Sequence, residues 1–324
     1  MAQHKKAVFV IGAGRSGTST ITRALQALGV DLGNHFKKAS RKNPKGFFED
    51  ADLLAISKAA RRTLKLRADS VRLIDETAFD HPKLNDLQDR AIGVIQDRFG
   101  QSPIWGFKYG RTLRILPFWD RILDATHSTP AFVIALRHPL SVAKSRAKID
   151  PRRGRQAASD LEWLVSIVPF LRRTQHHPLV VVDYDDLMDA PQQTLMRVAK
   201  ELDLPQDTAS ESHIGAFVDG FLDTNLRHTR FTDEDLGTAP DLNPIVKDAY
   251  RLLKTLSQTS YDEAQKEQVR QAFWNQWADI EARVADLGPI LALIDERESL
   301  WRKAITSPLG PLQAWALIKP WFKQ

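Results

Sequence analysis

The sequence predicts an α/β fold in which a parallel β-sheet is flanked by helices. Three short apolar segments with the composition of buried strands lie at residues 7–11, 131–136 and 179–182. A stretch with helical character follows each of them, and strands that alternate with helices in this way pair in parallel. A glycine-rich turn at 12–17 joins the first strand to its helix. From about residue 245 onward the pattern is helical, which predicts a mainly helical C-terminal extension.

The first helix is expected at residues 18–29. Ile21, Leu25 and Leu28 would share its buried face, and Gly29 is a helix stop.

The remaining elements continue the alternation. Pro139 follows the second strand and suits the first turn of a helix. The third strand precedes an acidic loop and then an amphipathic helix. Further helices are expected at 51–66, 83–99 and 157–173, and the C-terminal helical region is broken at Gly288-Pro289.

Length and composition bound the class of protein. The chain has 324 residues, 43% of them hydrophobic, which is ample for a large core. We expect residues 1–230 to form the α/β domain and residues 231–324 to form the helical extension, packed on the same domain. No apolar run approaches the roughly 18 residues of a membrane span, and the N-terminal segment lacks the long apolar region of a secretory signal. With zero cysteines, which exclude disulfides and thiolate chemistry, these features predict a cytoplasmic protein.

The charge distribution is basic in two places. Net charge is +6, from 46 basic and 40 acidic residues, an excess too modest to predict nucleic-acid binding. Basic clusters lie at 36–45 and 144–155. Each is either a solvated face or a surface for an anionic ligand or an acidic acceptor.

The glycine-rich segment GAGRSGTST, which begins at Gly12, indicates an anion site. Such a turn aims backbone N–H groups and the positive end of a helix at one point. Gly12 and Gly17 have the spacing of a Walker-type nucleotide loop, but Thr18 stands where that loop has its lysine. An ATPase or GTPase is therefore disfavoured. Gly12, Gly14 and Gly17 also satisfy G-x-G-x-x-G, which alone is a weak dinucleotide signal, and the loop's only cation is Arg15.

The run RSGTST resembles the 5′-phosphosulfate-binding loop of sulfotransferases that use 3′-phosphoadenosine 5′-phosphosulfate (PAPS), in which Lys or Arg precedes Ser-Gly-Thr. The resemblance implies a P-loop-type fold. It also implies that PAPS is bound by Gly14, Arg15, Ser16, Gly17, Thr18 and Ser19. A sulfuryl group in transfer carries less negative charge than a γ-phosphoryl group, so fixed donors and side-chain cations can stabilise it and no metal is expected.

The segment FVIALRHPLSVAKS resembles the 3′-phosphate-binding segment of the same family, in which an Arg ends a strand and a Ser follows eight residues later. These residues are Arg137 and Ser145. An arginine at the end of a strand can fork onto a phosphate. The alternative is that Arg137 pairs with a carboxylate and Ser145 faces solvent.

The segment WGFKYGRTLRILPFW resembles the bacterial pattern W-G-x-K-D-P-R. Trp105, Lys108 and Arg111 match it, whereas Tyr109 and Gly110 replace its Asp and Pro. The resemblance implies that Lys108 lies near the sulfuryl group and helps to neutralise the leaving oxygen. It also implies a catalytic role for Arg15, which would stabilise the developing charge together with Lys108.

Two more segments extend the resemblance to residues 8–230. NPKGFFED at 43–50 matches a segment common in bacterial members. FVDGFLDTNLRHTR at 217–230 resembles the closing L-R-H segment, which implies that Arg227 and His228 lie near the cofactor or the acceptor.

A general base must accept the proton of the acceptor hydroxyl. In the resembling families it is often a Glu or His some twenty or more positions after the loop cation. Glu49 belongs to a matched motif and is favoured, although it could instead cap the helix near residue 51. His35 is the alternative base, because it is twenty positions beyond Arg15 and imidazole titrates near neutrality.

The resemblance thus implies a PAPS-dependent sulfotransferase that modifies a hydroxyl (or amine) of a carbohydrate, lipid or small molecule by in-line displacement. A kinase using ATP and Mg²⁺ stays open, because Asp183 ends an apolar strand as a Walker B carboxylate does and Lys108 could replace the missing lysine. A non-catalytic nucleotide-binding module also stays open. In that module Glu49 and His35 would be inert.

The C-terminal tryptophans offer two interpretations. Trp301, Trp315 and Trp321 could contact lipid or a partner at the membrane surface, or pack in the core of the last helices, which we favour. The sequence does not indicate an oligomeric state.

Overall fold

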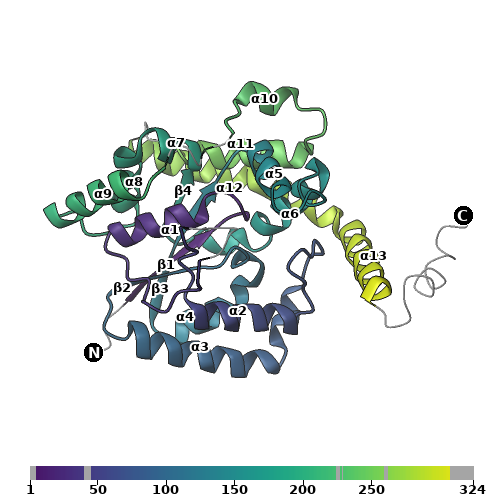
Figure 1. Ribbon diagram of the computed structural model, residues 1–324, viewed down its shortest axis with the longest axis horizontal. Coiled ribbons are helices and arrows are strands. Elements are labelled where there is room, and N and C mark those ends of the chain that lie inside the picture. Colours follow the sequence, from purple (N-terminus) through teal and green to yellow (C-terminus); the bar gives the residue numbers. More distant parts are fainter. Residues whose placement is uncertain (1–4, 40–44, 224–226, 228, 259–261, 307–324) are drawn as a thin grey trace, which may run out of the picture.

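The computed structural model describes residues 5–39, 45–223, 227, 229–258 and 262–306. Four parallel strands form one sheet in the order β2-β1-β3-β4. Their bounds are β1 Lys5–Ile11, β2 Ile104–Lys108, β3 Ser128–Leu136 and β4 Leu179–Asp183. Helices cover both faces, which confirms the predicted fold class (Figure 1).

The helices of the α/β part are α1 Thr18–Ala27, α2 Ala51–Thr63, α3 Lys83–Phe99, α4 Leu116–Ala125, α5 Pro139–Ala147, α6 Gln156–Ile167, α7 Tyr184–Asp189, α8 Pro191–Glu201 and α9 Thr208–Gly220. The later helices are α10 Asp233–Thr238, α11 Pro244–Thr255, α12 Glu263–Asp286 and α13 Gly288–Thr306. Short 3₁₀ turns lie at Glu76–Asp80, Leu113–Ile115 and Leu171–Thr174.

The alternation of side chains along β1 builds the two halves of the core. Phe9 points to the face covered by α2, α3 and α4, whereas Val8 and Val10 point to the face covered by α1, α8 and α9 (Figure 1). Phe9 lies 5.4 Å from Trp119 and 6.0 Å from Phe107 between ring centroids. Truncating a buried Phe of this kind to Ala costs about 3–5 kcal/mol.

Strand β2 was not predicted, and Gly106 in its middle explains why. A Cβ at Gly106 would lie 2.7 Å from Val30, because the chain after α1 passes over the strand at that point. The Gly106 N–H donates to the carbonyl of Asp31 at 2.8 Å. A glycine that leaves room for a neighbouring segment breaks the apolar run by which a buried strand is recognised.

Two other boundaries differ from the predictions. The helix expected at 157–173 ends at Ile167, and Phe170 adopts a left-handed backbone with φ 62°. The acidic segment after β4 is helix α7 rather than a loop, because the Asp183 carboxylate caps it by accepting from the Asp185 N–H at 2.8 Å.

The last helices pack back on the sheet domain through α11, which contacts β3, β4 and α6. The α12–α13 boundary falls at Gly288, where the helical region was expected to break. Among the described residues, no helix is both long enough and apolar enough to span a membrane.

Candidate functional site

The glycine-rich loop after β1 is held between β3 and α7 at the carboxyl edge of the sheet. Gly12 has φ 134°, and a Cβ there would lie 2.6 Å from the carbonyl oxygen of Ala135. Gly17 has φ 82°, and a Cβ there would lie 2.2 Å from the ring of Tyr184. Both positions therefore require glycine, for backbone shape and for space.

The N-terminus of α1 is open toward this loop. Gly17 is its N-cap and supplies no side chain, and the first turn has no acidic residue. The first N–H groups of the helix and its positive end are therefore not satisfied by a side-chain cap. The hydroxyl of Ser16, the residue before the cap, is fully buried and has no hydrogen-bond partner among the described residues. A buried orphan hydroxyl beside an uncapped helix is suited to an anion.

Residues from two separate motifs meet on one side of the loop. Arg15 donates from Nε to Ser145 Oγ at 3.0 Å, and its carbonyl accepts from Arg137 Nη1 at 3.3 Å. The Arg137 guanidinium lies 4.5 Å from the ring centroid of Tyr184. Its Nε is buried without a hydrogen-bond partner among the described residues. Neither alternative for this pair is observed: Arg137 forms no ion pair with a carboxylate of the described residues, and Ser145 binds Arg15 instead of only facing solvent.

Lys108 also reaches the loop, from the end of β2. Its Nζ donates to Ser19 Oγ at 3.1 Å and to the carbonyl of Phe47 at 2.9 Å, and it lies 3.1 Å from Glu49 Oε1. The side chain is almost completely buried, and this burial lowers the pKa of Lys108 although Glu49 opposes the shift. Arg15 and Lys37 nearby lower the pKa of Lys108 further.

The two candidate bases occupy different surroundings. Glu49 is buried between Lys108 and Lys37, whose Nζ lies 3.3 Å from Glu49 Oε2. His35 pairs through Nδ1 with the Asp52 carboxylate at 2.9 Å and has no contact with Lys108. Thus Glu49 joins the group at the loop and His35 does not.

The cap of α2 is Asp50, not Glu49. Its carboxylate accepts from the N–H groups of Asp52 and Leu53, so capping does not account for Glu49.

The positive charges of Arg15 and Arg137 repel each other. Desolvation lowers the pKa of Arg15, and the charge of Arg137 lowers it further. Desolvation also lowers the pKa of Arg137. A bound anion would relieve this repulsion, because opposite charge favours the protonated forms of all the cations.

Of the other predicted residues, Arg227 is engaged elsewhere, Arg111 has no hydrogen-bond partner among the described residues, and His228 is not described. Arg227 donates from Nε to Asp185 at 2.8 Å and also pairs with Asp189, so two carboxylates already neutralise it. His228 lies outside the described residues. Arg111 is partly buried, and its side chain has no hydrogen bond within the described part of the chain.

The backbone carbonyls of two further loop residues, Thr18 and Gly14, accept hydrogen bonds from neighbouring side chains. Thr18 is buried, and its carbonyl accepts from Thr22 Oγ1 at 2.7 Å. The Gly14 carbonyl accepts from Arg146 Nη2 at 3.4 Å.

Sequence reasoning missed Tyr184 and Arg146. Tyr184 fills the space beside Gly17 and lies under Arg137, but it stood in a segment taken for an acidic loop. Arg146 is buried and donates to the carbonyl of Ser159 at 2.5 Å and to that of Gly14 at 3.4 Å. Burial lowers the pKa of Arg146 to about 10. Its position in the basic cluster 144–155 was the only signal for it.

The carboxylate that resembled Walker B has other partners. Asp183 Oδ1 accepts from the Asp185 N–H, and Oδ2 accepts from the Tyr250 hydroxyl at 3.2 Å. Burial raises the pKa of Asp183 to about 6, and nearby Asp186 adds to the shift.

The fold and the site together define an α/β protein with a glycine loop, an open helix end and convergent cations at the carboxyl edge of a parallel sheet. The profile of the Sulfotransferase family matches residues 7–208, well over half of the chain. The chain therefore belongs to the sulfotransferase family, which confirms the resemblance drawn from its motifs.

The protein is also similar to solved bacterial sulfotransferase structures. Sulfotransferase STF9 from Mycobacterium avium matches with 16% identity and a TM-score of 0.43, over 85% of this chain and 76% of that one. The sulfotransferase domain of the Synechococcus PCC 7002 olefin synthase matches with 17% identity and a TM-score of 0.39, over 83% and 96%. The sulfotransferase domain from the curacin biosynthetic pathway matches with 17% identity and a TM-score of 0.37, over 83% and 97%. No curated protein sequence matches the chain.

Proposed function

We propose that the protein transfers a sulfuryl group from PAPS to a hydroxyl or amine of an acceptor. The observation that carries the proposal is a pair of separate cationic groups that contact the loop and the first turn of α1. Arg15, Arg137 and Ser145 form one group. Lys108 and Ser19 form the other. PAPS carries two separate anionic groups, and the buried hydroxyl of Ser16, which has no hydrogen-bond partner among the described residues, lies in the same loop.

Each group has a distinct role in binding. Arg137 and Ser145 bind the 3′-phosphate, since a guanidinium and a hydroxyl are its usual partners. The N–H groups at the start of α1 and the Ser16 hydroxyl bind the 5′-phosphosulfate, with the positive helix end directed at it. PAPS supplies the sulfuryl group to be transferred.

The chemical step is an in-line displacement at sulfur. The acceptor oxygen forms a bond to sulfur while the bond from sulfur to the 5′-phosphate oxygen breaks, and the electron pair stays on that oxygen. Lys108 stabilises the charge that develops there, in a site that excludes water because its ammonium group is almost completely buried. Glu49 accepts the acceptor's proton, which requires its contacts with Lys108 and Lys37 to loosen when the acceptor binds. His35 is the alternative base.

The kinase alternative requires Asp183 to hold Mg²⁺. Each of its carboxylate oxygens already accepts one hydrogen bond, from Asp185 and from Tyr250. No specific observation therefore favours a metal-dependent phosphotransferase.

Calorimetric titration with 3′,5′-ADP, beside Mg·ATP, tests the donor class. We expect 3′,5′-ADP to bind in the micromolar range and Mg·ATP to bind much more weakly. Arg137→Ala should weaken 3′,5′-ADP binding about 10- to 100-fold, the worth of a charge-assisted hydrogen bond. Arg121→Ala is the matched control, because Arg121 is a half-exposed arginine paired with Asp80. Tight Mg·ATP binding that is indifferent to a 3′-phosphate would overturn the proposal in favour of a kinase.

A further inference from the structure

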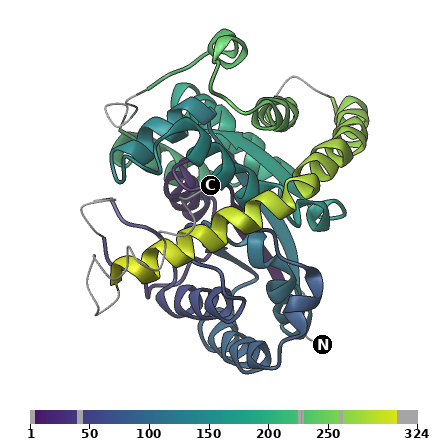
Figure 2. The same ribbon diagram turned by 90° about the vertical axis from the view of Figure 1, so that its right-hand side faces the viewer.

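A cavity of about 600 Å³ lies between α13, α6 and the segment 67–71. This volume is in the range of sites for small organic ligands. Helix α13 crosses in front of the carboxyl edge of the sheet, so the cavity lies on the same side of the molecule as the glycine loop (Figures 1 and 2). Helix α13 falls outside residues 7–208, so the segment that matches the family does not account for this wall.

The cavity adjoins the loop through one arginine. Glu162 lines the cavity, and its carboxylate lies 3.9 Å from Arg146 Nη2. The same Nη2 donates to the Gly14 carbonyl at 3.4 Å. A single guanidinium thus separates the cavity wall from the glycine loop.

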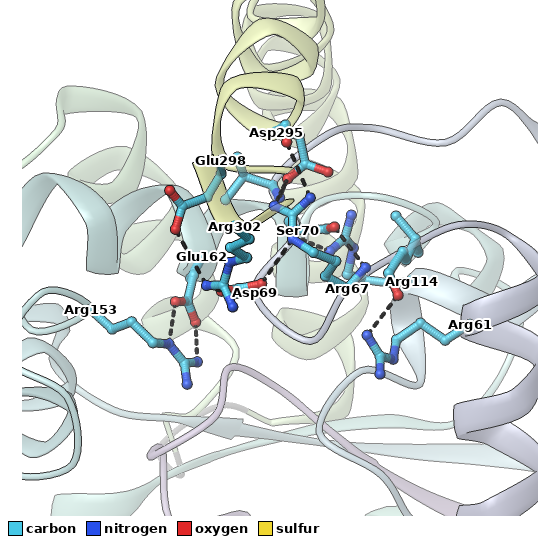
Figure 3. A network of polar contacts seen from close by, with 12 residues as sticks. Arg61, Arg67, Asp69, Ser70, Arg114, Arg153, Glu162, Asp295, Glu298 and Arg302 are labelled. Carbon is cyan, nitrogen blue, oxygen red and sulfur yellow. Dashed lines mark hydrogen bonds and ion pairs between the residues drawn. The ribbon is translucent and has the colours of Figure 1, made fainter. Parts of the chain in front are cut away.

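Ion pairs fix α13 over the cavity. The Asp295 carboxylate accepts from the Val71 N–H at 2.8 Å and from Arg67 Nη2 at 3.2 Å (Figure 3). About two turns further along α13, Arg302 pairs with Asp69 (Figure 3). The cavity therefore has a wall anchored at two points, and not a loose helix beside a gap.

Nine of the fifteen lining residues are charged and six are apolar, but the surface that the lining exposes to the cavity is mostly apolar. Val71 and Leu161 on α6 pack in one small cluster with Leu291 of α13, whereas Ile294 and Trp301 remain 38% and 43% exposed. The exposure of Trp301 corrects our expectation that it belongs to the core. Trp315 and Trp321 lie outside the described residues. Apolar side chains that line a concave space and stay accessible favour a ligand with an apolar body.

The charges of the lining leave a positive rim. All four lining carboxylates are paired with arginine: Asp69, Glu162, Asp295 and Glu298. Arg155 is exposed, and its side chain has no partner within the described residues. It is also the N-cap of α6, which has no side-chain cap and no acid in its first turn. Arg152 beside it is 72% exposed and lies 3.5 Å from Asp150. The positive N-terminus of α6 and the two arginines together favour a ligand with an acidic group at this rim.

We propose that this cavity binds the acceptor, and that the acceptor is an anionic amphiphile. Its apolar body contacts Ile294 and Trp301, its acidic group binds at Arg152 and Arg155, and its hydroxyl is directed toward the loop past Glu162. The acceptor role rests on the proposed function, whereas binding of the amphiphile does not.

The test is calorimetric binding of 12-hydroxydodecanoate below its micelle concentration, without nucleotide. Ile294→Gln should weaken binding about tenfold, because it places an amide against the apolar body. Leu293→Gln is the matched control, since Leu293 is the neighbouring residue on α13, is 45% exposed and does not line the cavity. Arg155→Gln should weaken binding of the acid while leaving that of uncharged dodecane-1,12-diol unchanged.

The proposal would be overturned if Ile294→Gln and Leu293→Gln weakened binding equally, or if 12-hydroxydodecanoate did not bind. Sedimentation showing that the wild type self-associates and that Ile294→Gln abolishes this would also overturn it, because a second copy would then occupy the cavity.

Titration with 3′,5′-ADP on the same samples separates the two proposals. If the nucleotide binds and the amphiphile does not, the cavity proposal fails alone, and the reverse result removes only the donor assignment. With PAPS added, mass spectrometry should detect the sulfate ester of 12-hydroxydodecanoate but no product from dodecanoate. Binding of both ligands without that ester would overturn the acceptor role.

Discussion

Lys108 and Glu49 form a buried ion pair at the edge of the glycine loop, with Nζ and Oε1 3.1 Å apart. Lys108 ends β2, whereas Glu49 precedes α2, so two distant segments bring together the groups to which we assign charge stabilisation and proton acceptance. A buried pair of this kind contributes little net stability, because desolvation offsets the attraction. Its presence at the loop is better explained by chemistry than by folding.

Lys108→Met should lower kcat about 100-fold or more, because it removes one fixed donor from the developing negative charge. The Glu49 carboxylate would not be left alone, since Lys37 remains 3.3 Å away. Thermal unfolding and 3′,5′-ADP affinity should therefore change much less than kcat. A variant that keeps full kcat would contradict the role of Lys108.

As pH rises, kcat should begin to fall at a lower pH than it would if Lys108 had the pKa of an exposed lysine. Burial lowers the pKa of Lys108 from the usual 10.5, so the ammonium form is lost as pH rises through that lower value. In Lys108→Arg the alkaline limb should move upward, because guanidinium stays protonated. The pH profile of kcat for the two enzymes checks this, and identical limbs would assign the limb to another group.

Glu49→Gln should reduce kcat by about 10²- to 10⁴-fold, the range for loss of a general base, while nearly preserving shape and size. His35→Gln should leave kcat close to the wild-type value, because His35 contacts Asp52 and not the loop. Steady-state kinetics of both variants with one acceptor decides between them. If the losses are reversed, His35 is the base.

Gly17→Ala should destabilise the protein and abolish nucleotide binding. The new Cβ would lie 2.2 Å from the Tyr184 ring at a residue with φ 82°, so both contact and backbone conformation oppose it. Gly14→Ala is the matched control within the same loop, because no atom lies within 4 Å of its Cβ position. Differential scanning calorimetry should show a lower melting temperature for Gly17→Ala than for the wild type, and an unchanged one for Gly14→Ala. Similar melting temperatures for both variants would mean that the loop is not packed against Tyr184.

Asp183→Asn should stabilise the protein at pH 7 and leave sulfuryl transfer intact. Burial raises the pKa of Asp183 from 3.8 to about 6 in the folded state, so the folded protein holds this proton more tightly than the unfolded chain does. Wild-type stability therefore falls as pH rises from about 4 to about 6, by at most about 3 kcal/mol. Denaturant unfolding of both proteins across this range checks the sign. If Asp183→Asn abolishes activity, the Walker B interpretation returns.

The order of short motifs along the sequence predicted which residues meet. Arg15, Arg137, Ser145 and Lys108 were assigned from separate segments, and the structure brings them to one loop. That was predictable because a loop and the ends of parallel strands share one edge of the sheet. Tyr184 was not predictable, since its importance comes from the space beside Gly17, which only the packing of α7 against the loop reveals.

The cavity beside α13 was beyond sequence reasoning for a related reason. Its walls come from residues more than 200 positions apart, such as Arg67 and Asp295, and no local pattern marks that pairing. The apolar residues of α13 look like an ordinary helix face in the sequence, and their exposure appears only once the neighbouring elements are in place.

The central claim, that the loop binds PAPS through its 3′-phosphate, is tested most directly by comparing 3′,5′-ADP with AMP, which lacks that phosphate. Calorimetry on wild type, Arg137→Ala and Lys108→Met gives the preference for the 3′-phosphate in each protein. We predict a preference of about 10- to 100-fold in wild type that disappears in Arg137→Ala and persists in Lys108→Met. Equal affinity of wild type for the two nucleotides, or a preference unaffected by Arg137→Ala, would contradict the account.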